Sequence, residues 1–199
     1  MTIADRIRIL DVKTLSSDWG VVKKTTFDYR RSGGDWQRQT RETYDRGNGA
    51  TILLYNLAQR TVILTRQFRF PCYLNGYDDL LIETPAGLLD KQTPEERIRG
   101  EVEEETGFHV RAPEKIFEAY MSPGSVTEKL TFFAAAYESD DKKSSGGGIA
   151  SEGEDIETME TPIDEALAMI ADGRICDAKT IMLIQHAALT VFKSASGKV

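Results

Sequence analysis

Four glutamates fall within five consecutive positions of the segment EVEEE, at residues 101, 103, 104 and 105. The surrounding sequence EERIRGEVEEETG is typical of a helix that ends at Gly107, because glycine readily takes the left-handed C-cap conformation. Glu101 and Glu105 are four residues apart and share one face, where like charges repel. The C-terminal end of a helix also carries partial negative charge, which makes carboxylates unfavourable there. A divalent cation such as Mg²⁺, which prefers oxygen ligands, would neutralise this face; a solvated acidic surface is the alternative.

These glutamates need a framework that positions them. Thr93, Pro94 and Glu96 form an N-terminal capping pattern, which predicts a helix over residues 93–106. Two more helices are expected, at 161–173 with Thr161 as N-cap, and at 179–193. Alternating apolar and polar residues predict strands at 21–30, 36–45, 50–56, 61–68, 80–84, 115–122 and 129–138. This order of elements indicates an α+β domain with a mixed sheet.

Two glycine-rich segments connect these elements. RSGGD (31–35) is typical of a hairpin turn between the first two predicted strands. DKKSSGGGIASEGED (141–155) is rich in glycine and serine and ends in acidic residues, which predicts a mobile loop.

The composition excludes several classes of protein. The chain has 199 residues, of which 40% are hydrophobic and 29% charged, as in an ordinary globular protein. Its formal charge of −7 argues against a nucleic acid as the main partner. No apolar run approaches the ~20 residues needed to span a bilayer, and the N-terminus has no apolar export segment. The two cysteines, Cys72 and Cys176, are widely spaced and are expected as free thiols. These features together indicate a cytoplasmic protein without membrane contact.

AGLLDKQTPEERIRGEVEEETGF resembles the Nudix box, G-x5-E-x7-R-E-U-x-E-E-x-G-U, in which U is a bulky apolar residue. Glu101, the pair Glu104-Glu105, Gly107 and Phe108 match it from the right. The resemblance implies a Nudix-like α/β/α sandwich and hydrolysis of nucleoside diphosphates linked to another moiety. It implies Mg²⁺ held by Glu101, Glu105 and the carbonyl of Ala86, with Glu104 among the candidate catalytic carboxylates.

The match departs from the box at three points. Gly100 stands at the arginine position, the spacer from Gly87 is one residue short, and the first glutamate position falls near Gln92 or Thr93. The missing arginine and glutamate read as the joint loss of one supporting ion pair, and Arg97 or Arg99 can take over part of that role. Gly100 in mid-helix should cost about 1 kcal/mol relative to alanine.

The resemblance extends to the GDP-mannose pyrophosphatase branch of the Nudix family through YDRGNGATILLYN, RQFR, ETPAGLLD, YMSPGSVTE, GGGIASEGEDIE and CDAKT. In that branch the acidic loop supplies a further metal ligand and catalytic glutamate. Glu154 takes this role by resemblance, with Glu152 as its rival. General-base work by such a carboxylate fits metal-assisted hydrolysis, since neither histidine accompanies a nucleophile signature.

The resemblance also implies a set of substrate contacts. Arg69 can pair with a diphosphate through its fork of donors, and Lys179 is a ligand contact; a surface arginine and a helix-start lysine are the plain alternatives. Trp19 matches a position that stacks on the base, although a core or interface tryptophan is as good an interpretation. The other implied contacts are Thr40, Arg41, Glu42, Ala86, Gly87, Leu88, Glu105, Glu128 and Glu154.

The expected organisation has two parts. Residues 1–45 form an N-terminal β extension that mediates dimerisation and brings Thr40, Arg41 and Glu42 to the partner's site, and residues 46–199 form the Nudix hydrolase domain. The leading hypothesis is Mg²⁺-dependent hydrolysis of GDP-mannose to GMP and mannose 1-phosphate by a homodimer. Hydrolysis of ADP-ribose or another nucleoside diphosphate sugar is one alternative, and a non-catalytic nucleotide-sugar sensor is the other.

Overall fold

The computed structural model describes residues 2–193 and divides into two compact units. The first unit contains the chain up to Asn48 together with Tyr120–Lys129. The second contains Gly49–Ala119 and the described residues from Leu130 onward. None of the helices within residues 2–193 combines the length and apolar character needed to cross a bilayer.

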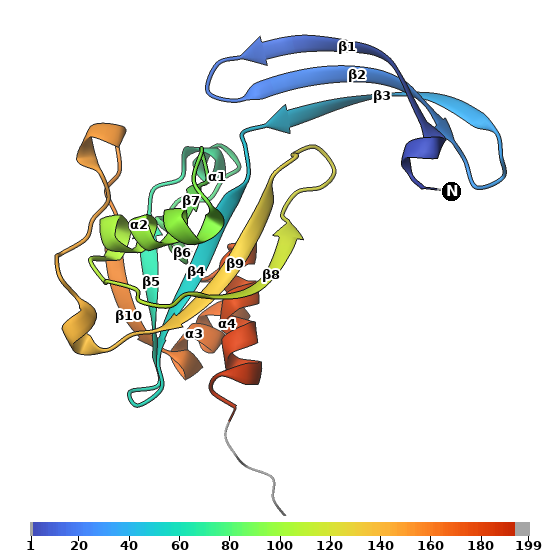
Figure 1. Ribbon diagram of the computed structural model, residues 1–199. Helices are drawn as coiled ribbons and strands as arrows, with labels where there is room; N and C mark the ends of the chain where they lie inside the picture. The colour runs from blue at the N-terminus through green and yellow to red at the C-terminus, as the bar shows by residue number, and fades with distance from the viewer. Residues whose placement is uncertain (1, 194–199) are drawn as a thin grey trace, which may run out of the picture. The chain divides into compact units, whose positions relative to one another are not determined.

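The first unit is built on a three-stranded antiparallel sheet. After a short 3-10 helix, η1 (Ala4–Arg6), it contains β1 (Ile7–Ser17), β2 (Val21–Arg30) and β3 (Trp36–Asp45) (Figure 1). The bounds of β2 and β3 and the hairpin at 31–35 agree with the sequence prediction. Strand β1 was not predicted: Ile9 and Leu10 are adjacent and break the alternation of apolar and polar residues, and its apolar side chains line no core, with Ile9 59% and Val12 51% exposed.

Tyr120–Lys129 joins the first unit through backbone bonds to β3. Tyr44 N donates to Ser125 O at 2.8 Å, and Thr127 N donates to Tyr44 O at 3.0 Å. These bonds connect segments about eighty residues apart in the chain, so no local pattern in the sequence could have predicted them.

The second unit is built on a seven-stranded mixed sheet, with β10–β5–β4–β9–β8 in order, β6 paired with β5 and β7 paired with β4. Strands β4 and β9 run parallel, whereas β10 and β5, β4 and β5, β4 and β7, and β5 and β6 pair in the antiparallel sense. The strands are β4 (Gly49–Asn56), β5 (Thr61–Gln67), β6 (Leu81–Glu83), β7 (Ala86–Leu88), β8 (Glu114–Tyr120), β9 (Lys129–Ala136) and β10 (Glu157–Pro162).

Helices cover both faces of this sheet, which confirms the expected α+β class with a mixed sheet (Figure 1). Helix α2 (Pro94–Thr106) lies on one face, and α3 (Ile163–Ala171) and α4 (Ala178–Thr190) lie on the other. Because successive side chains of a strand point to opposite faces and both faces are covered, β4 is buried along nearly its whole length, including the polar Thr51 and Asn56. Its Ala50, Ile52 and Leu54 pack with the α2 residues Ile98 and Val102.

Several elements differ from the sequence prediction. Thr161 is not the N-cap of α3: it pairs with Val62 in the β10–β5 ladder, and the helix begins at Ile163 after Pro162. Strand β7 and the five-residue helix α1 (Phe70–Leu74) were not predicted, because each is too short to show a periodicity. The 3-10 helix η3 (Ala150–Glu152) lies in the region predicted as a loop, and η2 (Ser139–Asp141) ends at the first residue of that region.

Candidate active site

Helix α2 begins and ends where the sequence predicts. Thr93 accepts from Glu96 N, and the Glu96 carboxylate accepts from Thr93 N at 2.9 Å, which completes a capping box. At the other end Gly107 has φ 76°, and a Cβ there would collide with Ser144 O. Only glycine satisfies both conditions, so the position where the glutamate run stops is fixed by its backbone.

The glycine-rich loop is bound to the C-terminal end of α2. Gly148 N donates to Glu104 O and Gly147 N to Glu105 O, both at 2.9 Å, while Lys143 N donates to Gly107 O at 2.7 Å. These amides satisfy carbonyls that a helix end leaves without partners. The sequence predicted a mobile loop here; the structure instead shows its glycines as a cap on the helix that carries the glutamates.

The four glutamates of the run divide between core and solvent. Glu101 and Glu105 are only 4% and 2% exposed, whereas Glu103 is exposed and lies 2.5 Å from His109 Nδ1. Glu104 is half-buried between them. The solvated acidic face, the alternative interpretation of this run, therefore describes Glu103 but not Glu101 or Glu105.

The buried pair is held in an unfavourable electrostatic state. Burial raises the pKa of Glu101 to about 7, against the attraction of Arg97, and the charges of Glu104 and Glu154 act in the same direction as burial. Burial, followed by repulsion from Glu101, raises the pKa of Glu105 well above its usual range. Glu105 Oε2 is buried and has no hydrogen-bond partner among residues 2–193. An unpaired buried carboxylate oxygen is costly unless a cation or proton meets it.

Arg97 is the arginine of α2 that contacts the glutamate run. Its guanidinium contacts Glu101 Oε1 four residues later, and its Nη1 lies 3.7 Å from Glu104 Oε2. Arg99 instead pairs with Glu95 and donates to the carbonyls of Val110 and Arg111. Of the two candidates for the vacant role, Arg97 is the one that faces the glutamates.

The loop before α2 packs directly against the first of these carboxylates. Ala86 and Gly87 lie in β7, which pairs with Thr51 and Ala50 of β4. A Cβ at Gly87 would collide with the carboxylate of Glu101, so a side chain there would push this carboxylate out of place. Glycine is required at this close approach, and β7 brings the Ala86 and Leu88 backbone to the same edge of α2.

The acidic loop contributes one of its two candidate carboxylates. The charge of Glu154 acts on both Glu101 and Glu105, and its Oε2 accepts from Ile149 N at 2.8 Å. Glu152 lies exposed in η3. Of the two loop carboxylates, Glu154 is the one with a marked electrostatic effect on the α2 glutamates.

The donors that surround this face suit a hard divalent cation. They are carboxylate and carbonyl oxygens, and Glu105 Oε2 has no other partner in the described chain. Within residues 2–193 no three His, Cys, Asp or Glu side chains already converge tightly enough to hold a metal.

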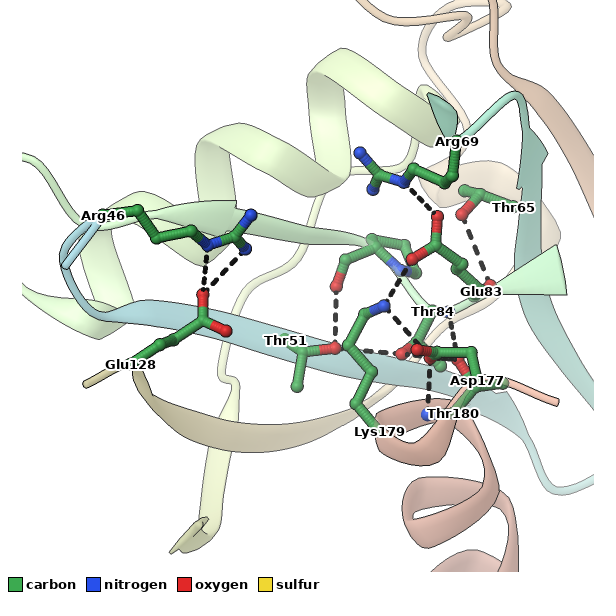
Figure 2. Close-up of polar contacts among 11 residues, drawn as sticks. Arg46, Thr51, Thr65, Arg69, Glu83, Thr84, Glu128, Asp177, Lys179 and Thr180 are labelled. Carbon is green, nitrogen blue, oxygen red and sulfur yellow. Dashed lines mark hydrogen bonds and ion pairs between the residues drawn. The ribbon is translucent and has the colours of Figure 1, made fainter. Parts of the chain in front are cut away.

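A second cluster of charges lies on β6, the α1 N-cap and the start of α4 (Figure 2). Glu83 is 3% exposed and accepts from Arg69 Nε at 2.6 Å and from Lys179 Nζ at 2.5 Å. Lys179 also donates to Asp177 at 3.0 Å. The two sequence-predicted cations are thus brought together: Arg69 pairs with a buried carboxylate, and Lys179 is a buried lysine in the first turn of α4. Glu83 and Asp177 were missed, because only the folded chain joins them to these cations.

The first unit holds the other predicted substrate residues. Glu128 is 8% exposed and accepts from Arg46 Nε at 3.0 Å and Nη2 at 2.8 Å (Figure 2). The Arg46 guanidinium lies 5.7 Å from the ring centroid of Trp19, which is 71% exposed and so is no core tryptophan. Sequence reasoning missed Arg46, although it lies in the quoted YDRGNG segment.

Thr40, Arg41 and Glu42 lie on β3 of the same unit. Thr40 Oγ1 lies 3.3 Å from Thr26 Oγ1, while Arg41 donates to Gln39 and to the Thr40 carbonyl. Arg41 and Glu42 are exposed. Their described contacts are within this sheet, and they stay as predicted contributors to a partner's site.

The cysteines are not catalytic candidates. Both are free thiols, and burial raises the pKa of the Cys72 thiol, which makes it a poorer nucleophile.

Comparison with known proteins places this geometry in a family. A structure titled "Crystal structure of ADP compounds hydrolase" superposes with a TM-score of 0.69 over 92% of this chain and 93% of that chain, at 20% identity, so the two share a fold. A family model described as the GDP-mannose pyrophosphatase NudK N-terminal domain matches residues 6–44.

Closer relatives are two proteins named GDP-mannose pyrophosphatase. The one from Pectobacterium atrosepticum is 58% identical over 182 residues, covering 91% of this chain and 93% of its own. The one from Yersinia enterocolitica is 54% identical over 183 residues, covering 92% and 95%. The chain therefore belongs to the GDP-mannose pyrophosphatase branch of the Nudix family, as the box resemblance implied.

The buried glutamate pair leads to a prediction about metal. Excess Mg²⁺ should raise the melting temperature, because a cation that binds only the folded chain at 100 times its Kd adds about 2.7 kcal/mol of stability. Glu101→Gln and Glu105→Gln should remove most of this shift and lower turnover at least ~10²-fold. Glu103→Gln, in the same run but exposed, is the matched control and should keep both.

The same shift should depend on pH. The Glu101 carboxyl binds its proton more tightly in the folded chain, so its stabilising contribution is present below its ordinary pKa of 4.5 and is lost as the pH rises through about 7. Mg²⁺ competes with that proton, so the shift should be larger at pH 8 than at pH 6, by differential scanning fluorimetry. Equal shifts in wild type and both buried-glutamate variants would locate the metal elsewhere.

Proposed function

We propose that this protein hydrolyses the diphosphate bond of a nucleotide sugar, GDP-mannose first, to give GMP and mannose 1-phosphate. The observation that carries the proposal is the buried Glu101–Glu105 pair, whose unpartnered oxygen calls for a cation. The names of the curated relatives support the choice of substrate. The retained carboxylates favour an enzyme over a sensor, which would not need all of them.

Mg²⁺ is the proposed cofactor, held by Glu101, Glu105, Glu154 and the Ala86 carbonyl. When bound, such an ion stabilises charge on the phosphates and lowers the pKa of water. Glu104 and Glu154 are the carboxylates that can hold a water or accept its proton beside that charge, with Glu152 as the alternative. Arg69 and Lys179 offer N–H donors to the diphosphate. Gly87 and Leu88 offer backbone contacts next to Ala86.

The first unit is proposed to recognise the nucleoside and sugar. Trp19 presents an exposed indole face for stacking on the base, and Glu128 is held by Arg46 as an acceptor for hydroxyl groups. We further propose a homodimer in which residues 1–45 form the extension that mediates dimerisation, with residues 46–199 as the catalytic domain. Thr40, Arg41 and Glu42 then reach the partner's substrate. Free thiols suit a cytoplasmic location.

A substrate panel tests the activity. Purified protein should release GMP from GDP-mannose only with Mg²⁺, at a higher kcat/KM than it shows for ADP-ribose or UDP-glucose. The products are measured by phosphate release after phosphatase treatment. A preference for ADP-ribose would support the neighbouring specificity, and tight binding of GDP-mannose without any turnover would support the sensor.

The acidic loop yields a second test. Glu154→Gln should lose far more kcat than Glu152→Gln, because the Glu154 charge acts on the buried pair while Glu152 lies exposed, and both variants should still bind GDP-mannose. Glu152→Gln is the matched control, one carboxylate removed from the same loop. If the Glu152 variant is the inactive one, the roles are reversed; if neither falls tenfold, the base lies outside the loop.

Assembly is tested by mixing inactive subunits. The protein should sediment as a dimer at micromolar concentration, and Arg41→Ala should impair hydrolysis. When Arg41→Ala and Glu101→Gln subunits are exchanged, activity should return, because each mixed dimer holds one site with an intact Glu101 and an intact Arg41 from its partner. A fully active monomer, or no recovery on mixing, would refute the role in trans.

A further inference from the structure

Glu83 is the centre of the charge cluster shown in Figure 2. Its two carboxylate oxygens have separate partners: Oε2 accepts from Arg69 Nε and Oε1 from Lys179 Nζ. Both cations therefore depend on one side chain, which is itself 3% exposed. The attraction of Lys179 and Arg69 outweighs burial and lowers the pKa of Glu83, so it is a carboxylate.

The backbone that carries Glu83 is fixed on both sides. Thr65 of β5 donates to the Glu83 carbonyl at 3.3 Å, and the next amide, Thr84 N, donates to Thr180 Oγ1 at 2.8 Å. Thr180 in turn donates to Asp177 at 2.6 Å, and Asp177 accepts from Lys179. The bonds form a closed circuit from β6 to the start of α4 and back, so small movements of Glu83 are resisted from two elements.

The cations keep donors that this circuit does not use. Arg69 is bound through Nε, and its terminal nitrogens have no hydrogen-bond partner in the described part of the chain. Lys179 uses two of its three N–H groups, for Glu83 and Asp177. An arginine fixed at Nε presents its outer fork in one orientation, which matches bidentate binding of phosphate oxygens.

The cluster carries no net charge, since Glu83 and Asp177 balance Arg69 and Lys179. Attraction of a diphosphate by excess positive charge is therefore weak. The cluster acts on a diphosphate mainly through the direction of its free N–H donors. The charge of Glu105 also acts on Arg69, so the cluster is within electrostatic reach of the α2 glutamates.

We infer that Glu83 is a positioning residue for the diphosphate: it sets the orientation of Arg69 and Lys179 toward the phosphates without contacting the substrate. This inference rests on the proposed function. From its burial alone, Glu83 looks purely structural. The inference gives it a part in the conversion of the substrate and not in substrate binding.

A positioning residue and a residue that contacts the substrate should differ in their effect on KM. Glu83→Gln puts an amide NH₂ toward one of the cations and leaves the cluster with a net positive charge. It should lower kcat roughly 10²-fold, the order expected for a misplacement of ~1 Å, with KM unchanged or lower. Arg69→Gln should instead raise KM as well as lower kcat. Glu160→Gln removes a hydrogen-bonded carboxylate on β10 that faces Tyr137 and Thr61, and as control it should leave both constants unchanged.

Coupling between residues separates positioning from mere support. If Glu83 acts through Arg69, Glu83→Gln should have little further effect on kcat in the Arg69→Gln background. Full additivity of the two losses would overturn the inference. Glu83→Asp keeps the charge and hence the fold but cannot reach both cations, so it should also lose kcat. Wild-type kcat in a folded Glu83→Asp variant, judged by its melting curve, would overturn the inference too.

Binding of inorganic pyrophosphate, measured by calorimetry, does not depend on turnover. Arg69→Gln should weaken it at least ~10-fold, while Glu83→Gln should not, because the net positive charge persists. A wild type that binds pyrophosphate in this pattern but hydrolyses no nucleotide sugar would refute the proposed function and retain the cluster as a diphosphate site. Normal hydrolysis with no kcat loss in either Glu83 variant would refute the inference alone.

Discussion

Two carboxylates buried on one face of α2 oppose folding twice, through loss of hydration and through mutual repulsion. Neighbouring elements compensate at specific atoms. Arg97 contacts Glu101, and amides of the glycine-rich loop occupy carbonyls at the helix end, where the partial negative charge would add to that of Glu105. One oxygen of Glu105 stays unpaired in the described chain, so no protein group there compensates its burial. Under the proposed function a cation would complete the arrangement, so the unfavourable interaction would also be the source of affinity for the metal.

The charge cluster around Glu83 solves a related problem in the opposite way. Each buried charge there has partners within the protein, and the cluster is neutral. Under the proposed function, charge is thus left uncompensated where the metal would bind and balanced where the substrate would be oriented. A strongly positive pocket would hold phosphates tightly in the ground state as well as in the transition state, which lowers KM without raising kcat. Oriented donors on a neutral cluster avoid that outcome.

Local patterns accounted for what is local in this structure. The ends of α2 follow from Thr93, Glu96 and Gly107, whose capping bonds span at most a few residues. The α3 N-cap was misplaced because Thr161 belongs to a ladder with β5, a contact made a hundred residues away in the chain. Glu83, Asp177 and Arg46 escaped attention for the same reason. Each is ordinary in its own segment, and becomes informative only when folding sets it against a distant charge.

One departure from the Nudix box is the glycine at the arginine position. Nothing in the structure explains glycine at position 100, where the nearest atom to an added Cβ is Glu104 Oε1 at 3.7 Å. Arg97 contacts Glu101 from four residues earlier on the same face. Residues at this spacing are neighbours on a helix, so a cation can approach the first buried glutamate from the preceding turn. The motif does not record this contact, whereas burial of the Glu101 carboxylate makes a nearby positive group favourable.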